Sequence, residues 1–188
     1  MTSRLLSGGI RLLHALVLGL VGAGIVHIAI LLLLPVVSER DAWSRLARSG
    51  DLYAVVRASG GAGDRRVLRL TDPFIEAVAC RFDLGDGIAR IRAAGHVPFW
   101  SVSVYDRNGT NVYSFNDHAT VDGNLDILVL TPMQMVELRK DLPPEFQSSI
   151  FVEADIEEGI VVVNSFVPDP SWKPAISAYL KGATCGTE

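Results

Sequence analysis

The longest stretch of the chain without Asp, Glu, Lys or Arg runs from Leu12 to Val37, and it is almost wholly apolar. Its only ionisable residues are His14 and His27. A helix of this length reaches about 39 Å, whereas the hydrocarbon core of a membrane is about 30 Å thick. The stretch therefore predicts one tilted transmembrane helix, because no other segment could cover a core helix that is apolar on all sides.

The residues around this stretch distinguish a membrane anchor from a cleaved signal peptide. The apolar part of a signal peptide has about 7–15 residues and ends at a cleavage site of small residues. Here the apolar stretch is much longer, and Pro35 to Glu39 contain no Ala-x-Ala pattern. We therefore interpret the stretch as an uncleaved signal anchor.

One face of the predicted helix carries small residues. Ala15, Gly19 and Ala23 recur every four positions, and His27 continues the row. Residues four apart share a helix face, and small residues let a second membrane helix approach closely. This face is a candidate contact with another membrane protein. The alternative is a neutral His27 that is tolerated in a single-span anchor.

Alternating apolar and polar residues dominate the rest of the chain and predict short strands separated by turns. The dipeptide Asn108-Gly109 favours a hairpin turn over Asp106–Gly109, because Gly adopts positive φ readily. The predicted strands are Ala77–Asp83, Ile88–Ala93, Phe99–Tyr105, Thr110–Phe115, Leu125–Leu130, Ile150–Ala154 and Gly159–Phe166.

Three further helices are predicted around these strands. Ser38–Ser49 forms a short helix with Ser38 as its N-cap, and Thr131 caps a second helix that runs to Lys140. A third helix covers Trp172–Lys181, with Cys185 in the tail after it. The pattern predicts a mainly β (α+β) fold, with one antiparallel β-sandwich or barrel-like domain and two peripheral helices.

These elements divide the chain into four parts. We expect a cytoplasmic stub at 1–11, the transmembrane helix at 12–37, a membrane-proximal connector at 38–70 and a β-domain at 71–188. The β-domain is long enough for one sizeable core, and the sequence shows no internal repeat.

Charge is distributed unevenly between these parts. Of the 17 Lys and Arg residues only two precede Ser38, whereas all 21 Asp and Glu residues follow it, which gives the remainder a formal charge of −6. An acidic domain without a basic run argues against nucleic acid as a partner and against docking on anionic lipid. Arg residues flank the predicted span on both sides, so the positive-inside rule does not orient it.

The two cysteines bear on the compartment. Cys80 and Cys185 pair in an oxidising space and stay free in a reducing one. We favour the pair, with the N-terminus in the cytoplasm of a bacterium, the span in its inner membrane and the domain in the periplasm. Two unrelated buried thiols, or a domain that faces the cytoplasm, remain alternatives.

Catalytic signatures are absent from the sequence, which contains no His-Glu-x-x-His, Cys-x-x-Cys, Gly-x-Ser-x-Gly, P-loop or dinucleotide fingerprint. Two His residues near carboxylates lack the spacing of a metal site, so we expect no metal and no cofactor. Polar residues around the central hairpin could line a ligand groove at one loop end, or could simply satisfy turns. These candidates are His96, Trp100, Tyr105, Asp106, Tyr113, Asn116, Asp117 and His118.

Two segments carry a family resemblance. Phe99–Asp106 contains Trp-Ser-x-x-x-Tyr-Asp, and Asn111–Asp117 contains Tyr-Ser-x-Asn. The chain thereby resembles bacterial proteins of the domain-of-unknown-function 1254/1214 families, in particular their short, membrane-anchored alphaproteobacterial members. The resemblance covers most of residues 70–185 and implies a jelly-roll-like β-sandwich. It implies no catalytic residue, because these families have no assigned reaction.

The sequence therefore predicts a non-enzymatic, membrane-anchored periplasmic protein whose β-domain serves as an interaction or envelope-maintenance module. The alternative is an anchored periplasmic enzyme, or a small-ligand or carbohydrate-binding domain, that uses the loop end near His96 and His118.

Overall fold

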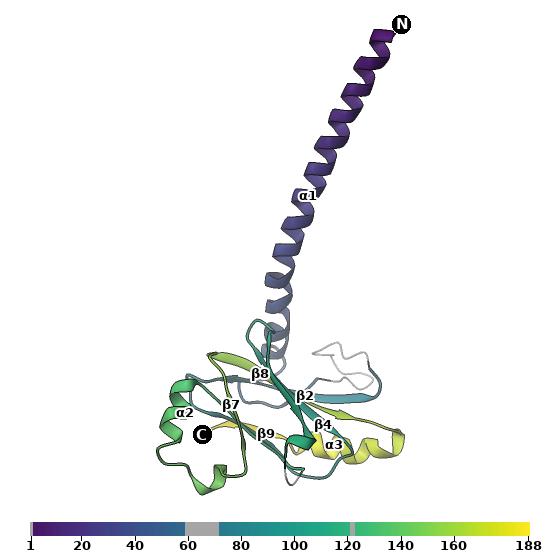
Figure 1. Ribbon diagram of the computed structural model, residues 1–188. Coiled ribbons are helices and arrows are strands. Elements are labelled where there is room, and N and C mark those ends of the chain that lie inside the picture. The colour runs from purple at the N-terminus through teal and green to yellow at the C-terminus, as the bar shows by residue number, and fades with distance from the viewer. Residues whose placement is uncertain (1, 59–71, 121–122) are drawn as a thin grey trace. The chain divides into compact units, whose positions relative to one another are not determined.

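The structure is a computed structural model that describes residues 2–58, 72–120 and 123–188 (Figure 1). The chain separates into two compact units, Met1–Ser38 and Glu39–Glu188. Residues 59–71, which belong to the predicted connector and the start of the β-domain, lie outside the described residues. Each unit is described by itself below.

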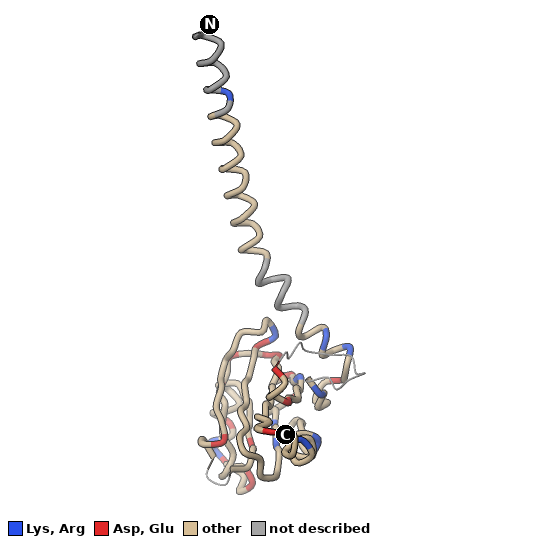
Figure 2. The backbone as a smooth tube through the Cα atoms, turned by 90° about the vertical axis from the view of Figure 1, so that its right-hand side faces the viewer, with Lys and Arg blue, Asp and Glu red and all other residues tan. Residues whose placement is uncertain are grey.

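The N-terminal helix α1 spans Thr2–Ala47. Its segment Leu13–Leu33 is long and apolar enough to cross a membrane, with a mean hydropathy of 2.7, and none of it is buried. Figure 2 shows this segment free of Lys, Arg, Asp and Glu. This candidate span lies within the predicted 12–37.

The predicted start of a separate helix at Ser38 is wrong. Helix α1 begins at Thr2 and continues through Pro35 and Ser38 to Ala47. A proline removes one backbone hydrogen bond from a helix, which is a local loss.

The second unit contains a five-stranded and a four-stranded sheet (Figure 1). Neighbouring strands of the five-stranded sheet are antiparallel, in the order β1 (Val56–Arg57), β2 (Ile75–Asp83), β8 (Glu158–Phe166), β4 (Trp100–Asp106) and β5 (Asn111–Asn116). The four-stranded sheet has the order β7 (Ile150–Glu153), β6 (Leu125–Leu130), β3 (Ala89–Ala93) and β9 (Thr184–Thr187).

The strand β7 corrects the expectation of a wholly antiparallel domain, because it runs parallel to β6. Parallel neighbours need a crossover rather than a tight turn. The crossover contains α2 (Pro132–Leu138) and the 3₁₀ turn η2 (Pro144–Phe146). Thr131 caps α2 as predicted, in a capping box with Gln134.

One hydrophobic core joins the two sheets. In β4 the side chains of Trp100, Val102 and Val104 are buried, whereas those between them are only partly covered, which confirms the predicted alternation. The same core includes Ile127 of β6 and further residues of β2, β3, β7 and β8. Helix α3 (Lys173–Lys181) closes part of this layer with Ile176, Tyr179 and Leu180.

The C-terminus ends in a strand rather than a tail. After α3 the chain forms β9, which pairs with β3 and sets Cys185 opposite Ile91. The four residues Thr-Cys-Gly-Thr carry no apolar alternation, so the sequence pattern does not reveal this strand.

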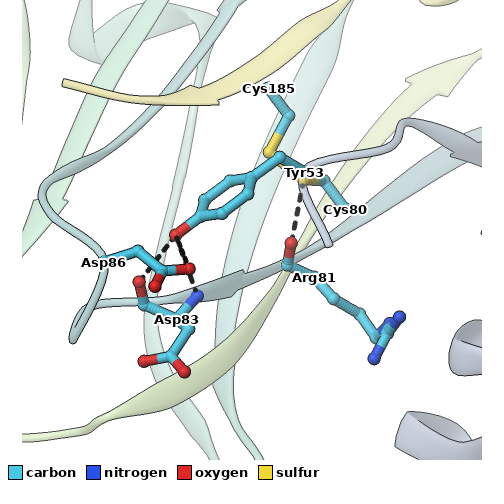
Figure 3. The surroundings of a disulfide bond; sticks show 6 residues. All are labelled: Tyr53, Cys80, Arg81, Asp83, Asp86 and Cys185. Carbon is cyan, nitrogen blue, oxygen red and sulfur yellow. Dashed lines mark hydrogen bonds between the residues drawn. A yellow bond between two sulfur atoms is a disulfide. The ribbon is translucent and has the colours of Figure 1, made fainter. Parts of the chain in front are cut away.

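A disulfide connects the two sheets. Cys80 lies on β2 of the five-stranded sheet, Cys185 lies on β9 of the four-stranded sheet, and the two are bonded (Figure 3). Tyr53 lies in their surroundings, where its hydroxyl donates to the backbone oxygen of Asp83 at 2.6 Å. Burial raises the pKa of Tyr53. The bond ties together segments 105 positions apart in the chain.

Candidate functional site

The candidate ligand-binding residues are divided between the two ends of the β4–β5 hairpin. Tyr105 and Asp106 lie at its turn, whereas Trp100 lies at its open end. About 17 Å of strand separates Trp100 from Tyr105, at 3.3 Å per residue. The set therefore does not form a single site.

Asp106 stabilises the turn of the hairpin. One of its carboxylate oxygens accepts hydrogen bonds from the backbone N–H of Asn108 at 2.9 Å and of Thr110 at 2.8 Å. Gly109 has a φ of 86°, in the left-handed region that glycine adopts at little cost. The exposed Arg107 forms an ion pair with Glu158 across the neighbouring strand. These contacts give Asp106 a structural role.

Trp100 is a core residue, which corrects its place among the candidate ligand-binding side chains. It is 1 % exposed, and its indole N–H donates to the backbone oxygen of Gly123 at 2.9 Å. Its ring meets Phe115 edge to face, with centroids 6.1 Å apart. An aromatic side chain packed and satisfied in this way offers no surface to a ligand.

At the open end of the hairpin, two polar atoms are buried without hydrogen-bond partners. Asn116 caps a 3₁₀ turn by accepting from the N–H of His118, and Asp117 follows it. Oδ1 of Asp117 and the hydroxyl of Tyr179 both lack a partner, although Nδ1 of His118 lies 3.3 Å from that oxygen. Burial, and then the charge of Asp117, raise the pKa of Tyr179.

The remaining candidates are exposed. His96 lies on the surface between β3 and β4, and His118 is 82 % exposed. Tyr113 is also exposed, with its ring against Phe115. Within residues 2–58, 72–120 and 123–188, no three His, Cys, Asp or Glu side chains are grouped closely enough to hold a metal ion.

A hollow lies elsewhere, on the face of the five-stranded sheet that is turned away from the core. We call it the outer groove. It is open to solvent on one side and has a volume of about 840 Å³. Its lining comes from the end of α1, from β2, β4 and β8, from the residue before β4 and from the β4–β5 turn: Ala42, Leu46, Ile75, Phe99, Ser101, Tyr105, Gly109, Ile160, Val162, Asn164, Ser165 and Phe166.

The last turns of α1 form one wall of the outer groove. Trp43 and Leu46 are buried against Ala77, Ala79 and Ile160 of the sheet. The guanidinium groups of two arginines lie over the indole of Trp43, Arg81 at 5.0 Å and Arg107 at 5.4 Å from its centroid, and these cation–π contacts help to restrain the ring.

The chemistry of the outer groove is that of a binding site for an apolar group. None of its lining side chains is charged, and its polar members are hydroxyl and amide groups. Small-molecule sites have volumes of about 300–1,000 Å³, a mainly apolar lining and a few polar groups that orient the ligand. Tyr105 is the one sequence-predicted candidate that lines it.

Sequence reasoning missed this groove, although β8 contained a signal. A strand with one solvated face alternates, whereas Gly159–Phe166 reads Gly-Ile-Val-Val-Val-Asn-Ser-Phe with four apolar residues in succession. A continuous apolar run predicts that both faces of a strand are covered. Val161 and Val163 face the core, which leaves Ile160 and Val162 on the opposite face.

Comparisons with known proteins bear on the fold alone. No protein-family model matches the chain, and no curated protein matches it. The chain is similar to the crystal structure of the VPA0106 protein from Vibrio parahaemolyticus, with a TM-score of 0.54 and 9% identity, over 80% of this chain and 35% of that one. An uncharacterized Burkholderia cenocepacia protein matches with a TM-score of 0.43 and 14% identity, over 70% and 37%. This chain spans about a third of the length of both.

Proposed function

We propose that the chain is a non-enzymatic, membrane-anchored binding protein whose β-domain uses the outer groove as its contact surface. The observation that carries the proposal is the groove itself, an open apolar hollow on a sheet face that the core does not require. Exposed apolar surface on a folded domain commonly marks a site of interaction with a protein, a ligand or a membrane.

The anchor and the disulfide support a location in the bacterial inner membrane, with the N-terminus in the cytoplasm and the domain in the periplasm. The segment Leu13–Leu33 has the length and composition of a span. Disulfides persist in oxidising spaces such as the periplasm and are rare in the cytosol.

Three finer points belong to the same proposal. The face formed by Ala15, Gly19, Ala23 and His27 packs against a second membrane helix. The two sheets form a jelly-roll-like sandwich, and the chain is a short member of the domain-of-unknown-function 1254/1214 families. The motifs of the β4–β5 hairpin motivate this membership.

Membrane fractionation tests the location. Alkaline carbonate extraction should leave the full chain in the membrane pellet and release a variant that lacks residues 2–37. Mass measurement with and without reductant should show one disulfide. Extraction of the full chain into the soluble fraction, or two free thiols in protein from its native compartment, would contradict the proposal.

A photoreactive phenylalanine analogue tests the groove as a contact surface. It replaces Val162, which lines the groove, or Val136, which is 63 % exposed on α2 and lies outside it. Irradiation of native membranes should give an adduct, of whatever class, at position 162 in clear excess over position 136. Equal labelling at both positions would show that the groove has no occupant of its own.

The partnerless atoms at the open end of the hairpin favour a second candidate function. A small polar ligand that donates to Asp117 and accepts from Tyr179 would satisfy both atoms. This is the alternative of an anchored enzyme or small-ligand or carbohydrate-binding domain near His96 and His118. A Tyr179→Phe variant that abolishes binding of a candidate ligand, while the fold is retained, would support it over the groove.

A further inference from the structure

We propose that the outer groove holds the acyl chain of a membrane phospholipid. This inference rests on the proposed function, because it names the occupant of the same surface and requires the chain to be anchored in a bilayer. The chemistry of the lining, the dimensions of the groove and its covalent distance from the span all favour this occupant.

The lining excludes a charged occupant and favours a hydrocarbon one. Its floor is formed by Ile160, Val162 and Phe166 of β8, and its walls include Leu46 and Ile75. Transfer of hydrocarbon from water to such a surface is favourable by about 0.8 kcal/mol per buried CH₂ group. A peptide strand or helix would bring backbone or charged groups that this lining has few partners to satisfy.

The dimensions of the groove match a single acyl chain. The groove follows β8 from Ile160 to Phe166, which is about 20 Å at 3.3 Å per residue. One leaflet of the hydrocarbon core is about 15 Å thick, half of the whole core, and this is the depth that one acyl chain fills. A lipid chain therefore fits lengthwise along the strand.

The covalent chain keeps the groove near a supply of lipid. Ala42 and Leu46 line the groove, and Ala42 comes nine positions after Leu33, where the apolar span ends. Nine residues reach at most about 32 Å even when fully extended. Among apolar ligands, bilayer lipid is therefore the one that tethering holds at high local concentration.

Aromatic side chains at one end extend the apolar surface beyond the groove. The rings of Phe74 and Phe166 lie 6.5 Å apart, and both side chains are exposed. Exposed aromatic pairs of this kind are typical of surfaces that contact lipid or a partner. At the other end of β8, Arg107 and Glu158 form an ion pair.

A photoreactive lipid tests the inference. The full chain is reconstituted in phosphatidylethanolamine–phosphatidylglycerol vesicles doped with a phospholipid that carries a diazirine on its acyl chain. After irradiation, labelled peptides are mapped by mass spectrometry. We expect labelling within residues 158–166 and 99–109, in addition to labelling of the span Leu13–Leu33, which serves as an internal control for insertion.

Two groove variants and one matched control give the result its specificity. Asn164→Asp introduces a charge with almost no change in volume, and Val162→Trp fills the groove. Each should lower labelling of residues 158–166 by about fivefold or more, with the span labelled as before, because uncompensated charge and lost space both oppose an acyl chain. Val136→Trp, outside the groove, should change neither signal.

The possible failures are distinguishable. A labelled span with unlabelled groove peptides would overturn the lipid inference and leave the anchored binding protein standing. An unlabelled span would overturn the anchor and with it both proposals. Equal labelling of the groove in wild type and in Asn164→Asp would also overturn the inference, since adhesion to the surface would then explain it. An intact disulfide and cooperative unfolding are required of each variant, and Asn164→Asp suffices if Val162→Trp does not fold.

Discussion

The two sheets differ in what covers their outer faces. On the four-stranded sheet, Leu128 and Leu130 are fully buried beneath Met135 of α2 and Phe146 of η2. On the five-stranded sheet, the end of α1 covers Ala77, Ala79 and Ile160 but leaves the strip toward Phe166 as the outer groove. The crossover between β6 and β7 thus covers the outer face of the four-stranded sheet, whereas the outer face of the five-stranded sheet is only partly covered.

This difference separates residues that the fold needs from residues that it leaves available. The covered face even holds a charge. Arg90 is 8 % exposed, binds both carboxylate oxygens of Asp126 at 3.1 and 2.8 Å and lies over the ring of Phe146. The groove face, in contrast, leaves the apolar side chain of Phe166 42 % exposed. Substitutions on the two faces should therefore have different consequences.

The largest effect is expected from the bond that holds the two sheets together. The double variant Cys80→Ala/Cys185→Ala opens a loop of 105 positions. Chain entropy for a loop of about 100 residues corresponds to a loss of about 4.7 kcal/mol. Denaturant unfolding of the full chain in detergent, followed by Trp fluorescence, measures this loss. Reduction of the wild type should reproduce it, and a change below about 1 kcal/mol would mean that the sheets associate without the bond.

A matched pair of phenylalanines tests the comparison directly. Phe146 is 5 % exposed on the covered face, and Phe166 is 42 % exposed at the groove. Phe146→Ala should cost about 3–5 kcal/mol in unfolding free energy, because it leaves a cavity and removes the ring beneath Arg90. Phe166→Ala should cost less than about 1 kcal/mol. Equal losses at the two positions would contradict the view that the groove face is dispensable to the fold.

The covered face also allows a test of its buried ion pair. The hydrogen bonds from Arg90 to Asp126 are the main reason that the pKa of this arginine is raised. Asp126→Asn keeps the shape and removes the charge, so we expect a loss of about 1.5–3 kcal/mol. The double variant Arg90→Met/Asp126→Leu should recover most of it, because no buried charge is left unpaired. A double variant as unstable as the single one would assign the effect to packing instead.

Much of the fold could be predicted from local patterns. The apolar stretch after Leu12, the alternation of Phe99–Tyr105 and the capped helix at Thr131 each depend on residues close together in sequence. Two features could not be predicted in this way. The parallel pairing of β7 and the strand that contains Cys185 depend on partners distant in the chain, which no local period encodes.

The candidate site was harder to predict than the fold. The polar residues near the hairpin have recognisable ligand-binding chemistry, yet Asp106 stabilises the turn and Trp100 is buried in the core. The outer groove is built from ordinary apolar residues such as Val162, which become a surface only because no other segment covers them. Sequence shows which residues are apolar, whereas tertiary structure decides which of them are left exposed.

The smallest expected effect concerns the buried hydroxyl of Tyr179 on α3. The hydroxyl of Tyr179 is buried without a partner, whereas that of Tyr53 donates a hydrogen bond at 2.6 Å. At neutral pH, Tyr179→Phe should therefore be neutral or stabilising by up to about 1 kcal/mol, and Tyr53→Phe should cost about 1 kcal/mol. Denaturant unfolding of both variants under the same conditions measures these changes. Each variant serves as the control for the other, because both lose a tyrosine hydroxyl.

The free energy of unfolding of Tyr179→Phe should also differ from that of the wild type at alkaline pH. An unfolded tyrosine loses its proton near pH 10, whereas burial raises the pKa of Tyr179 in the folded chain. Above pH 10 the unfolded state therefore binds fewer protons than the folded state, and the free energy of unfolding falls as pH rises. Tyr179→Phe should flatten this fall. An unchanged slope would show that water reaches the hydroxyl, and the layer between the sheets would then be open to solvent beside α3.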